Sequence, residues 1–592
     1  MTAAAPRPSA ATPARAWFRA LETTAEATRD PARTLARAAG EWAAAYGDAP
    51  AVLSDVEQFS FRALAERANR YSRWALAAGL AKGDVVALMM GARPEYFALW
   101  LGLTQVGVVV ALLNVNLTGA ALAHCVRVAG ARAAIVAAPF AETCADAFAG
   151  LPLDLWPHGG GDEARRLDLA LPAFAGAPLD DGERRATTLS DRALLIFTSG
   201  TTGLPKAAAV SHHRVVAWSH WFAGLADMRA DDRLYDCLPL CHSVGGVAAL
   251  AAALVNGGSV VIAEKFSANR FWSDVARWNC TIFQYIGELC RYLVAAPPTP
   301  ADKAHRLRLA CGNGLSADVW RAFVARFGLA QILEFYASTE GNLTLYNVEG
   351  KVGAIGRQPP FLAARDAIAL ARFDFDNEAP WRGPDGLGAR CGVDEIGEAV
   401  GRIGREAGQR FEGYTEPAET EKKVLRDVFA PGDAWMRTGD LMRRDREGFY
   451  YFVDRVGDTF RWKGENVATS EVAAALSAAP GVKEAIVYGV AVPGSDGKAG
   501  MAALVVAGAP NLEGIADAAS ALPRYARPLF LRVRPALEAT ATFKPLKRAL
   551  AEAGFDPTKV ADPLYVYDVE REAYVALDAP KYAEIVNGEA RL

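Results

Sequence analysis

The sequence predicts an α/β protein in which mainly parallel sheets are covered by helices. Apolar runs rich in β-branched residues alternate with amphipathic segments, and several of these runs end at Gly, Ser or Thr. The strand-like runs are residues 84–90, 131–138, 193–200, 257–264, 280–287 and 305–314. Repeated strand, crossover and strand units produce parallel pairing. Because ligands in such folds bind at the carboxyl ends of the strands, the loops after these runs are the candidate sites.

Residues 1–44 are predicted to form an N-terminal tail and a leading helix. The stretch 1–22 carries three arginines before Glu22 but has no continuous apolar run, which excludes a secretory signal. We expect a disordered tail in this stretch, and a transit peptide stays open as the alternative.

The most apolar run, residues 97–117, contains no charge and approaches the length of a membrane-spanning helix. Gly107 divides it into helix formers before and β-branched residues after. This pattern predicts a helix that packs on a buried parallel strand, and no transmembrane span.

Length and composition limit the class of protein. The 592 residues are 52% apolar and 22% charged, so we expect a globular chain of two or more domains. The net charge of -4, with dispersed basic residues, provides no field for DNA or RNA, and nucleic acid is not an expected partner. Eight sparse cysteines do not form a disulfide framework and predict a reducing, cytoplasmic setting. Peripheral association with the inner face of a membrane and the oligomeric state stay open.

The composition of the sequence changes after the region of predicted parallel strands. Residues 350–460 are rich in glycine and turn formers and predict short antiparallel strands. Residues 470–508 then read as helix, strand and strand of a smaller α/β unit. We therefore expect a large domain over 45–456 and a small one over 457–592.

The segment FTSGTTGLPKAA, residues 197–208, is the strongest candidate for a phosphate-binding loop. It lacks the Walker A spacing, because Lys206 is not followed by Ser or Thr in the required frame. Glycine lets a backbone approach anionic oxygens, hydroxyls donate hydrogen bonds and lysine supplies positive charge. The residues that fit these roles are Thr198, Ser199, Gly200, Thr201, Thr202, Gly203 and Lys206. Without further support, such a composition is equally typical of an exposed loop.

Three further segments follow in order and give the loop a context. They are FYASTEGN at 335–342, RTGDL at 437–441 and YFVDRVGDTFRWKGENVAT at 451–469. Together with the loop they resemble the acyl-adenylate-forming enzymes, which include acyl-CoA synthetases, luciferases and peptide-synthetase adenylation domains. The segments 458–469 and 540–550 are most similar to the fatty acid transport protein branch, the very-long-chain acyl-CoA synthetases.

The resemblance implies the fold and the cofactors in more detail. It implies a large N-terminal domain with a small β-barrel-like subdomain, and a small mobile α+β C-terminal domain. It also implies ATP, Mg²⁺ and coenzyme A. The loop 198–206 would close over the β- and γ-phosphates, Thr339 would contact the α-phosphate, and Glu340 would bind Mg²⁺.

Other motif positions would bind the nucleoside. The resemblance implies that Gly312, Asn313 and Tyr336 pack on adenine. Asp440 would accept hydrogen bonds from the ribose, and Arg455 would lie near ribose and phosphate.

The family carries out two steps with different requirements. A fatty acid carboxylate is already ionised at neutral pH, so adenylation needs charge stabilisation and no general base. The resemblance assigns this role to Lys544, with Thr198, Lys206 and Glu340 as the other catalytic candidates. Rotation of the small domain about Gly457 would then replace Lys544 by the loop 461–467, where Gly464 leaves room for the pantetheine arm of coenzyme A.

The segment 234–250 resembles the part of these enzymes that lines the acyl channel, and this resemblance implies an acyl pocket around His242, with Tyr285 and Gly287 as a further wall. Cys237 and Cys241 precede His242 but lack a fourth ligand at zinc spacing, so we expect no structural zinc. A small apolar pocket beside a histidine suits alkyl, aryl or steroid acids.

The expected function is ATP-dependent ligation of a long or very long-chain fatty acid to coenzyme A. Three alternatives stay open. They are a ligase for a sterol side-chain, bile or aromatic acid, an acyl-AMP ligase that feeds a carrier protein, and a fatty acid transport or binding protein of the same fold.

Overall fold

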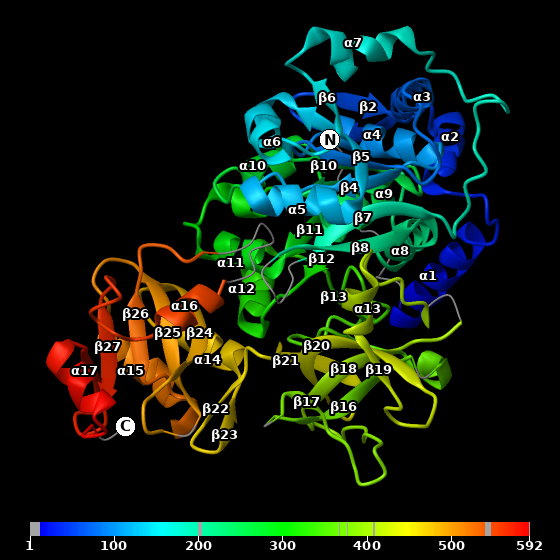
Figure 1. Cartoon of the computed structure of the whole chain (residues 1–592). Helices are drawn as coiled ribbons and strands as arrows, with labels where there is room; N and C mark the ends of the chain where they lie inside the picture. Colours follow the sequence, from blue (N-terminus) through cyan, green and yellow to red (C-terminus); the bar gives the residue numbers. More distant parts are fainter. Residues whose placement is uncertain are drawn as a thin grey trace. The chain divides into compact units, whose positions relative to one another are not determined.

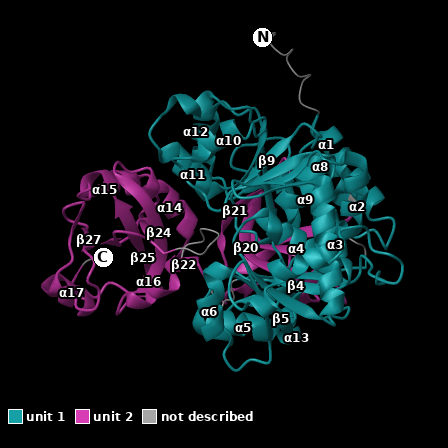
Figure 2. Cartoon of the chain, turned by 90° about the horizontal axis from the view of Figure 1, so that it is seen from above, with its two compact units in different colours: residues 1–363, 403–424 teal, residues 364–402, 425–592 magenta. Residues whose placement is uncertain are grey.

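The computed structural model describes residues 12–198, 204–365, 367–375, 377–405, 409–495, 497–538 and 546–590. The chain divides into two compact units (Figure 2). Unit 1 contains Met1–Ala363 and Ile403–Val424, and unit 2 contains Ala364–Arg402 and Leu425–Leu592.

A six-stranded sheet of unit 1 has the order β6-β5-β3-β4-β7-β8 (Figure 1). All neighbours are parallel except β8, which returns antiparallel beside β7. The strands are β3 (Val85–Met89), β4 (Val109–Leu112), β5 (Ala131–Ala137), β6 (Asp154–His158), β7 (Arg192–Thr198) and β8 (Lys206–Ser211). The three parallel strands predicted in this region are confirmed.

A second sheet of unit 1 has a parallel centre in the order β12-β11-β9-β10-β1, extended by β13 beside β12. Its strands are β1 (Pro50–Leu53), β9 (Arg233–Asp236), β10 (Ser259–Ile262), β11 (Ile282–Ile286), β12 (Leu309–Asn313) and β13 (Ile332–Ala337). The antiparallel strands β2 (Gln58–Ser60), β14 (Thr344–Asn347) and β15 (Gly356–Arg357) pair at its two sides. The strands predicted within 257–264, 280–287 and 305–314 are confirmed.

One hydrophobic core joins the two sheets of unit 1. It contains residues from β3, β4, β5 and β7 of the first sheet and from β1 and β9 to β13 of the second. Apolar faces of four helices contribute as well: α3 (Phe61–Ala77), α4 (Pro94–Gln105), α8 (His212–Leu225) and α9 (Leu250–Leu254). The other face of the six-stranded sheet packs on α5 (Gly119–Ala129) and α6 (Ala141–Phe148). Helices on both faces explain why these strands read as continuous apolar runs.

The N-terminal expectation needs a correction from residue 13 onward. The stretch predicted as a tail forms helix α1 (Pro13–Ala27), which packs against α8. Trp17 is 3% exposed, and its ring meets those of Trp221 and Tyr346 edge-on. A window of 1–22 hid this helix, because the proline- and alanine-rich residues 1–11 dilute its apolar face; those residues lie outside the described part of the chain.

The apolar run 97–117 divides as predicted. Helix α4 ends before Gly107, and the buried strand β4 follows. Within the described ranges, no helix has the length and hydropathy needed to cross a membrane.

Unit 2 begins with antiparallel strands in the order β17-β16-β18-β20-β21, with β19 beside β20. They are β16 (Ile368–Asp374), β17 (Ala379–Pro380), β18 (Gly397–Arg402), β19 (Val424–Arg426), β20 (Ala434–Arg444) and β21 (Phe449–Arg455). Antiparallel pairing is confirmed, but among the described residues this order is open and does not close into the expected barrel-like form.

The C-terminal part of unit 2 is a five-stranded sheet that packs with helices around its own core. The strands are β24 (Val482–Ala491), β25 (Lys498–Val506), β26 (Phe530–Val533), β27 (Leu564–Asp568) and β28 (Ala573–Ala576). The helices are α14 (Thr469–Ser477), α15 (Leu512–Ser520), α16 (Arg548–Ala553) and α17 (Ala579–Val586), and a hairpin of β22 (Phe460–Trp462) and β23 (Glu465–Val467) precedes them. The helix and the two strands predicted within 470–508 are confirmed.

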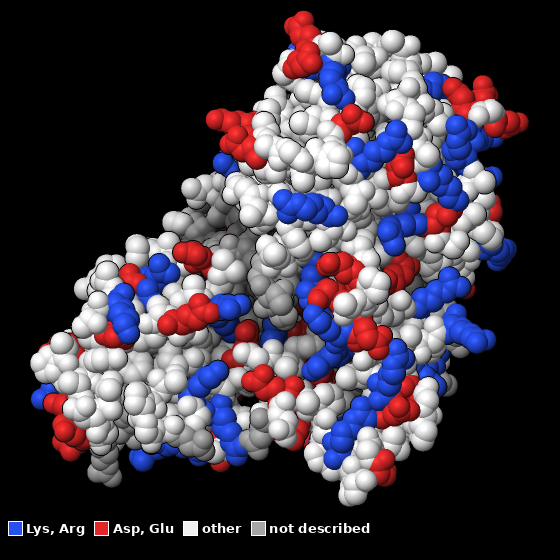
Figure 3. Space-filling model, viewed as in Figure 1, with Lys and Arg blue, Asp and Glu red and all other residues white. Residues whose placement is uncertain are grey.

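Charges of both signs are interspersed over the face of the molecule seen in Figure 3. All eight cysteines are free and buried, which agrees with the expected lack of a disulfide framework.

Candidate active site

The predicted phosphate loop connects the antiparallel strands β7 and β8. Thr198, the last residue of β7, is paired with Lys206, the first residue of β8. Ser199, Gly200, Thr201, Thr202 and Gly203 lie outside the described residues. The structure therefore fixes both ends of the loop side by side at the end of a buried strand.

Lys206 has a carboxylate partner in this structure. Its ammonium forms an ion pair with Glu419 and lies 5.8 Å from the centre of the Tyr414 ring. The pair is largely shielded, with 14% of the Lys206 side chain and 16% of the Glu419 side chain exposed. Lys206 and Lys422 hold the pKa of Glu419 below its usual value.

Glu340 and Thr339 follow strand β13 in the same unit. The Oγ1 atom of Thr339 lies 3.1 Å from Ser243 Oγ, and Glu340 is 8% exposed. Burial first, and then the charge of Glu340, raises the pKa of the Tyr414 phenol. Tyr414, whose ring faces Lys206, thus lies near the end of the phosphate loop and near the carboxylate predicted to bind metal.

The surroundings of Glu340 suit a magnesium ion that is shared with a nucleotide. No cluster of three or more His, Cys, Asp and Glu side chains occurs in the described part of the chain. Mg²⁺ is commonly held by one or two carboxylates, with substrate phosphates and water as the remaining ligands. A single buried carboxylate with the hydroxyl of Thr339 beside it fits this donor set.

Two cations lie near Glu340. Lys423 Nζ is 3.6 Å from Glu340 Oε1. Arg214, near the start of α8, donates from Nη2 to the Gly341 carbonyl at 2.7 Å. Burial lowers the pKa of Arg214, and Glu412 and Glu340 oppose that shift.

The predicted adenine loop and acyl wall lie on adjacent strands. Tyr285 pairs with Gly312 and Ile286 with Asn313 between the parallel strands β11 and β12. A Cβ atom at Gly312 would clash with the Tyr285 carbonyl oxygen. Gly287 approaches the Gly314 carbonyl equally closely, so only glycine fits at both positions.

A buried carboxyl group stabilises this loop through hydrogen bonds. Glu334 on β13 accepts a hydrogen bond from Leu315 N at 3.0 Å and another from the Tyr285 hydroxyl. Burial raises the pKa of Glu334 to about 8. Tyr336, two residues further along β13, pairs with Leu345 of β14.

His242 lies between β9 and the π-helical segment Val244–Ala249. Burial lowers its pKa to about 4, so the imidazole is neutral at physiological pH. Its Nε2 atom is buried and has no hydrogen-bond partner among the described residues. Asp236, at the end of β9, is fully buried and has its pKa raised by burial. A neutral imidazole suits an apolar chain better than a second charge.

The predicted ribose-binding residues pair with one another in unit 2. Asp440 of β20 is opposite Arg455 of β21, with 3.5 Å between Arg455 Nε and Asp440 Oδ1. The part of β20 just before Asp440 is held by Glu398, which accepts hydrogen bonds from Arg437 at 2.8 Å and from Gly439 N at 3.0 Å. Glu398 is fully buried.

The predicted hinge and thiol-facing residues also belong to unit 2. Gly457 has φ +86° and Gly464 has φ +85°, a backbone conformation that L side chains rarely adopt. Lys544 lies outside the described residues.

Two basic residues shortly after Lys544 differ in exposure. The Arg548 side chain is 74% exposed. Lys547 is instead bound within unit 2, 3.0 Å from Asp458 Oδ2 and 2.6 Å from Thr469 Oγ1.

Sequence reasoning missed several side chains around these motifs. They are Arg214, Ser243, Glu334, Tyr414 and Lys423. Each of these residues lies outside the quoted motifs and comes close to one of them only in the folded chain. Of these residues, only Glu334 gives a signal in the sequence, because it is a charged residue inside the apolar run of β13.

Comparison with known proteins decides the family. The profile described as AMP-binding enzyme matches residues 40–365, and the profile described as AMP-binding enzyme C-terminal domain matches residues 471–544. The chain belongs to the AMP-binding enzymes. It is therefore an enzyme of a nucleotide-binding family, as the motifs indicated.

Curated relatives place it further within the AMP-binding enzymes. The chain is 40% identical over 558 residues to long-chain fatty acid transport protein 6 of Mus musculus, covering 91% of this chain and 88% of the relative. It is 42% identical over 522 residues to long-chain fatty acid transport protein 1 of Homo sapiens, covering 86% of this chain and 80% of the relative. This AMP-binding enzyme is thus a member of the long-chain fatty acid transport protein family.

Solved structures of other AMP-binding enzymes share the fold. An anthranilate CoA ligase in complex with anthranoyl-AMP aligns with a TM-score of 0.75 at 21% identity, covering 88% of this chain and 97% of that one. A Mycobacterium tuberculosis fatty acyl CoA synthetase aligns with a TM-score of 0.62 at 22% identity, covering 88% and 98%.

Proposed function

We propose that the protein is an acid–thiol ligase that joins a long or very long-chain fatty acid to coenzyme A through an acyl-AMP intermediate. The observation that carries the proposal is the position of Tyr414 within one unit: Lys206 of the phosphate hairpin lies 5.8 Å from the centre of its ring, and the charge of Glu340 helps to raise its pKa. The family membership supports the same reaction.

In the proposed first step, the fatty acid carboxylate attacks the α-phosphorus of ATP, acyl-AMP forms and pyrophosphate leaves. The loop 198–206 and Lys206 bind the β- and γ-phosphates, and Thr339 donates to the α-phosphate. Mg²⁺ held by Glu340 and phosphate oxygens would neutralise phosphate charge. Lys544 approaches the carboxylate and the α-phosphate during this step.

Lys206 must exchange partners to take this role. In the structure its ammonium is paired with Glu419. The charge of a triphosphate exceeds that of one carboxylate, so ATP binding can draw Lys206 away from Glu419.

In the proposed second step, the sulfur of coenzyme A attacks the acyl carbon, its proton is released, the thioester forms and AMP leaves. Turning about Gly457 moves Lys544 away and brings the loop 461–467 with Gly464 to the thiol. The domains of the proposal are therefore a leading segment 1–44, a large domain 45–456 and a mobile domain 457–592.

The acyl chain is proposed to lie against His242, Tyr285 and Gly287. The neutral state of His242 supports this proposal, because a buried neutral imidazole does not repel an apolar chain. Adenine is proposed to pack on Gly312, Asn313 and Tyr336, and the ribose to bind Asp440 beside Arg455.

The test is pyrophosphate release with saturated fatty acids of increasing length and with cholate and benzoate as bulkier acids, each with and without coenzyme A. We expect the highest kcat/KM with long-chain acids and thioester formation only when coenzyme A is present. A maximum on cholate or benzoate would overturn the choice of acid. Acyl-AMP that accumulates despite added coenzyme A would overturn the second step, and the lack of any acid-dependent release would favour a binding protein.

A further inference from the structure

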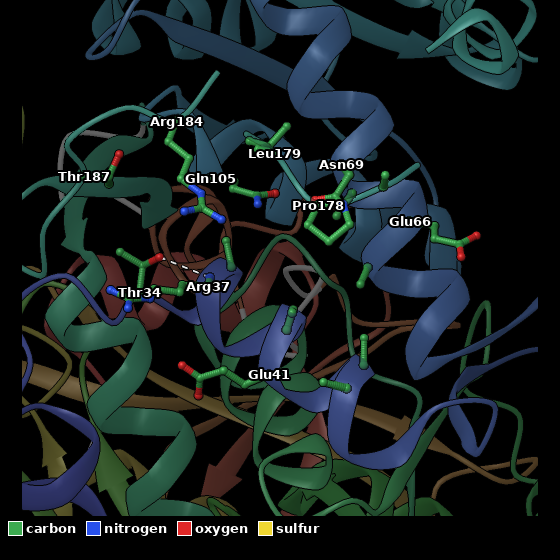
Figure 4. A pocket seen from close by; sticks show the side chains of 18 of the residues that line it. Thr34, Arg37, Glu41, Glu66, Asn69, Gln105, Pro178, Leu179, Arg184 and Thr187 are labelled. Carbon is green, nitrogen blue, oxygen red and sulfur yellow. Dashed lines mark hydrogen bonds between the residues drawn. The ribbon is translucent and has the colours of Figure 1, made fainter. Parts of the chain in front are cut away.

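A cavity of about 820 Å³ lies in unit 1 between α2 (Leu35–Tyr46), α3 and the segment 176–187 (Figure 4). None of the residues assigned above to nucleotide, acid or thiol lines it. Its volume is within the range of about 300–1,000 Å³ that is usual for small-molecule sites.

The floor of the cavity is apolar and made of small side chains. Ala39 of α2 is 4% exposed, Ala68 of α3 is 3% exposed, and Leu179 above them is 3% exposed. None of the described residues that line the cavity is aromatic, so it offers no surface on which a base could stack. Aliphatic walls of this kind suit a methylene chain better than a nucleotide.

The rim of the cavity carries an excess of positive charge. Four arginines line it, together with the carboxylates of Glu41 and Glu66. Glu41 is already paired with Arg33 at 2.8 Å. In Figure 4 the Arg184 side chain reaches toward the middle of the pocket, whereas the Glu66 carboxylate points outward. The four arginines are Arg37, Arg62, Arg184 and Arg185.

The rim arginines can change partners easily. Arg37 pairs with Asp30, and Arg184 pairs with Asp181. The side chains of Arg37 and Arg184 are 57% and 62% exposed, and ion pairs at such exposure contribute little. A ligand carboxylate or phosphate above an apolar floor would form a stronger, bidentate contact.

One wall of the cavity, the segment 176–187, is held in place by side-chain contacts. Asn69 Nδ2 donates to the Gly176 carbonyl at 2.9 Å, and Arg73 Nε forms an ion pair with Glu183 at 2.7 Å. Both contacts tie the segment 176–187 to α3.

The geometry points to a second ligand site here, one that takes an aliphatic chain with an anionic head. The chain lies over the alanines of α2 and α3, and the head is bound by Arg184 and Arg37. The ligand class does not depend on the proposed ligase activity, because none of the lining residues belongs to that site.

The experiment is equilibrium dialysis of the full-length protein with radiolabelled dodecanoate, dodecyl phosphate or dodecanol below their micelle concentrations. The catalytic site is first saturated with a non-hydrolysable dodecanoyl sulfamoyl adenosine. We expect an anionic probe to bind at one further site per chain, and dodecanol to bind at least about tenfold more weakly, as the loss of one charged contact predicts. Tighter binding of dodecanoate would identify a free fatty acid as the natural class, and tighter binding of dodecyl phosphate would identify a phosphate-headed lipid.

Variants locate the site. Arg37→Glu combined with Arg184→Glu should weaken the anionic probe about tenfold or more. Arg321→Glu combined with Arg571→Glu reverses two equally exposed arginines elsewhere, at 65% and 74% exposure, and should leave binding unchanged.

Ala177→Trp tests the cavity itself without altering charge, because Ala177 is an exposed lining residue where a large side chain does not disturb the core. It should block the probe. Binding that is unchanged in both pocket variants, equal binding of dodecanol, or no binding beyond the catalytic site would overturn the inference. Acid-dependent pyrophosphate release, followed in parallel, should persist in the pocket variants, and its absence from wild type would count against the ligase proposal alone.

Discussion

Lys423 Nζ lies 3.6 Å from Glu340 Oε1 within unit 1. The Glu340 side chain is 11% exposed and that of Lys423 is 24% exposed, so the pair is only partly screened by water. A divalent cation that uses Glu340 must share this carboxylate with the ammonium.

Lys423→Met should therefore increase the apparent affinity for Mg²⁺ by about two- to fivefold, the equivalent of about 0.5–1 kcal/mol for a partly exposed pair. The measurement is acid-dependent pyrophosphate release against free Mg²⁺ at saturating ATP. Lys581→Met, which removes an exposed partner of Glu584 in unit 2, is the control. Unchanged or weaker Mg²⁺ affinity in Lys423→Met would show that the lysine does not compete at Glu340.

The ion pair between Lys206 and Glu419 gives a second prediction. If Lys206 leaves Glu419 for ATP, Glu419→Gln should lower KM for ATP by about two- to threefold, because the competing carboxylate contributes about 0.5 kcal/mol. Lys206→Met should raise the same KM about tenfold or more, since a charge-assisted contact with phosphate is lost. Initial rates at varied ATP measure both effects, and a rise of KM in Glu419→Gln would reject the exchange of partners.

The raised pKa of Glu334 predicts a dependence of stability on pH. Burial moves its pKa from 4.5 to about 8, so the folded state binds a proton that the unfolded state has released between these values. The free energy of unfolding should then fall as pH rises through this window, by about 1.4 kcal/mol for each pH unit at most.

Glu334→Gln should flatten this profile. The amide oxygen can still accept from Leu315 N, and the amide nitrogen can donate to the Tyr285 hydroxyl oxygen. Urea unfolding at several pH values measures the slope, and Glu264→Gln at an exposed position is the control. Equal slopes in wild type and Glu334→Gln would show that this carboxyl group does not titrate in the window.

The sequence predicted β3, β5, β7 and β10 to β12 of unit 1 because these strands are largely buried, whereas the partly exposed strand β6 was not predicted. Residues 131–138 and 193–200, for example, read as apolar runs that end where the sheet ends, so β5 and β7 could be placed directly. Helix α1 was missed because the proline- and alanine-rich residues before it dilute its apolar face within the stretch 1–22.

In the candidate site, too, some residues could be predicted from local motifs and others could not. Thr198, Lys206 and Glu340 belong to contiguous motifs, and each motif could be read in one pass. Tyr414 and Lys423 lie in a segment with no motif, and they reach Glu340 only after the chain has folded back on itself. A single sequence therefore does not reveal side chains such as these, which come close to a motif residue from a distant segment of the chain.

Glu398 is another residue without a motif, and it supports the part of β20 that carries Asp440. It is fully buried and pairs with Arg437. Glu398→Ala should lower the free energy of unfolding by about 3 kcal/mol, because an arginine is left beside an empty buried position.

Glu395→Ala is the matched control for Glu398→Ala. Glu395 also pairs with an arginine, Arg372, but its side chain is 34% exposed and its loss should cost less than about 1 kcal/mol. Denaturant unfolding compares the two variants. A similar loss in both would show that the buried pair gives no particular support to this part of β20.

Lys544 and Lys547 are three residues apart, and the two-step proposal assigns them different roles. Lys544→Ala should slow acid-dependent pyrophosphate release by at least about a hundredfold, as the loss of one preorganised charge predicts. Thioester formation from supplied acyl-AMP and coenzyme A should continue. Lys547 instead contacts Asp458, next to Gly457, and Thr469.

Lys547→Met should accordingly lower both half-reactions together and reduce Tm, because it loosens the segment after Gly457 and removes no group from either reaction. Rapid-quench assays of each half-reaction, with a thermal melt of each variant, separate the two outcomes. Equal loss of both half-reactions in Lys544→Ala would contradict a lysine that serves adenylation alone. A selective loss of adenylation in Lys547→Met would move that role to Lys547, whose ammonium would then have to leave Asp458 during each turnover.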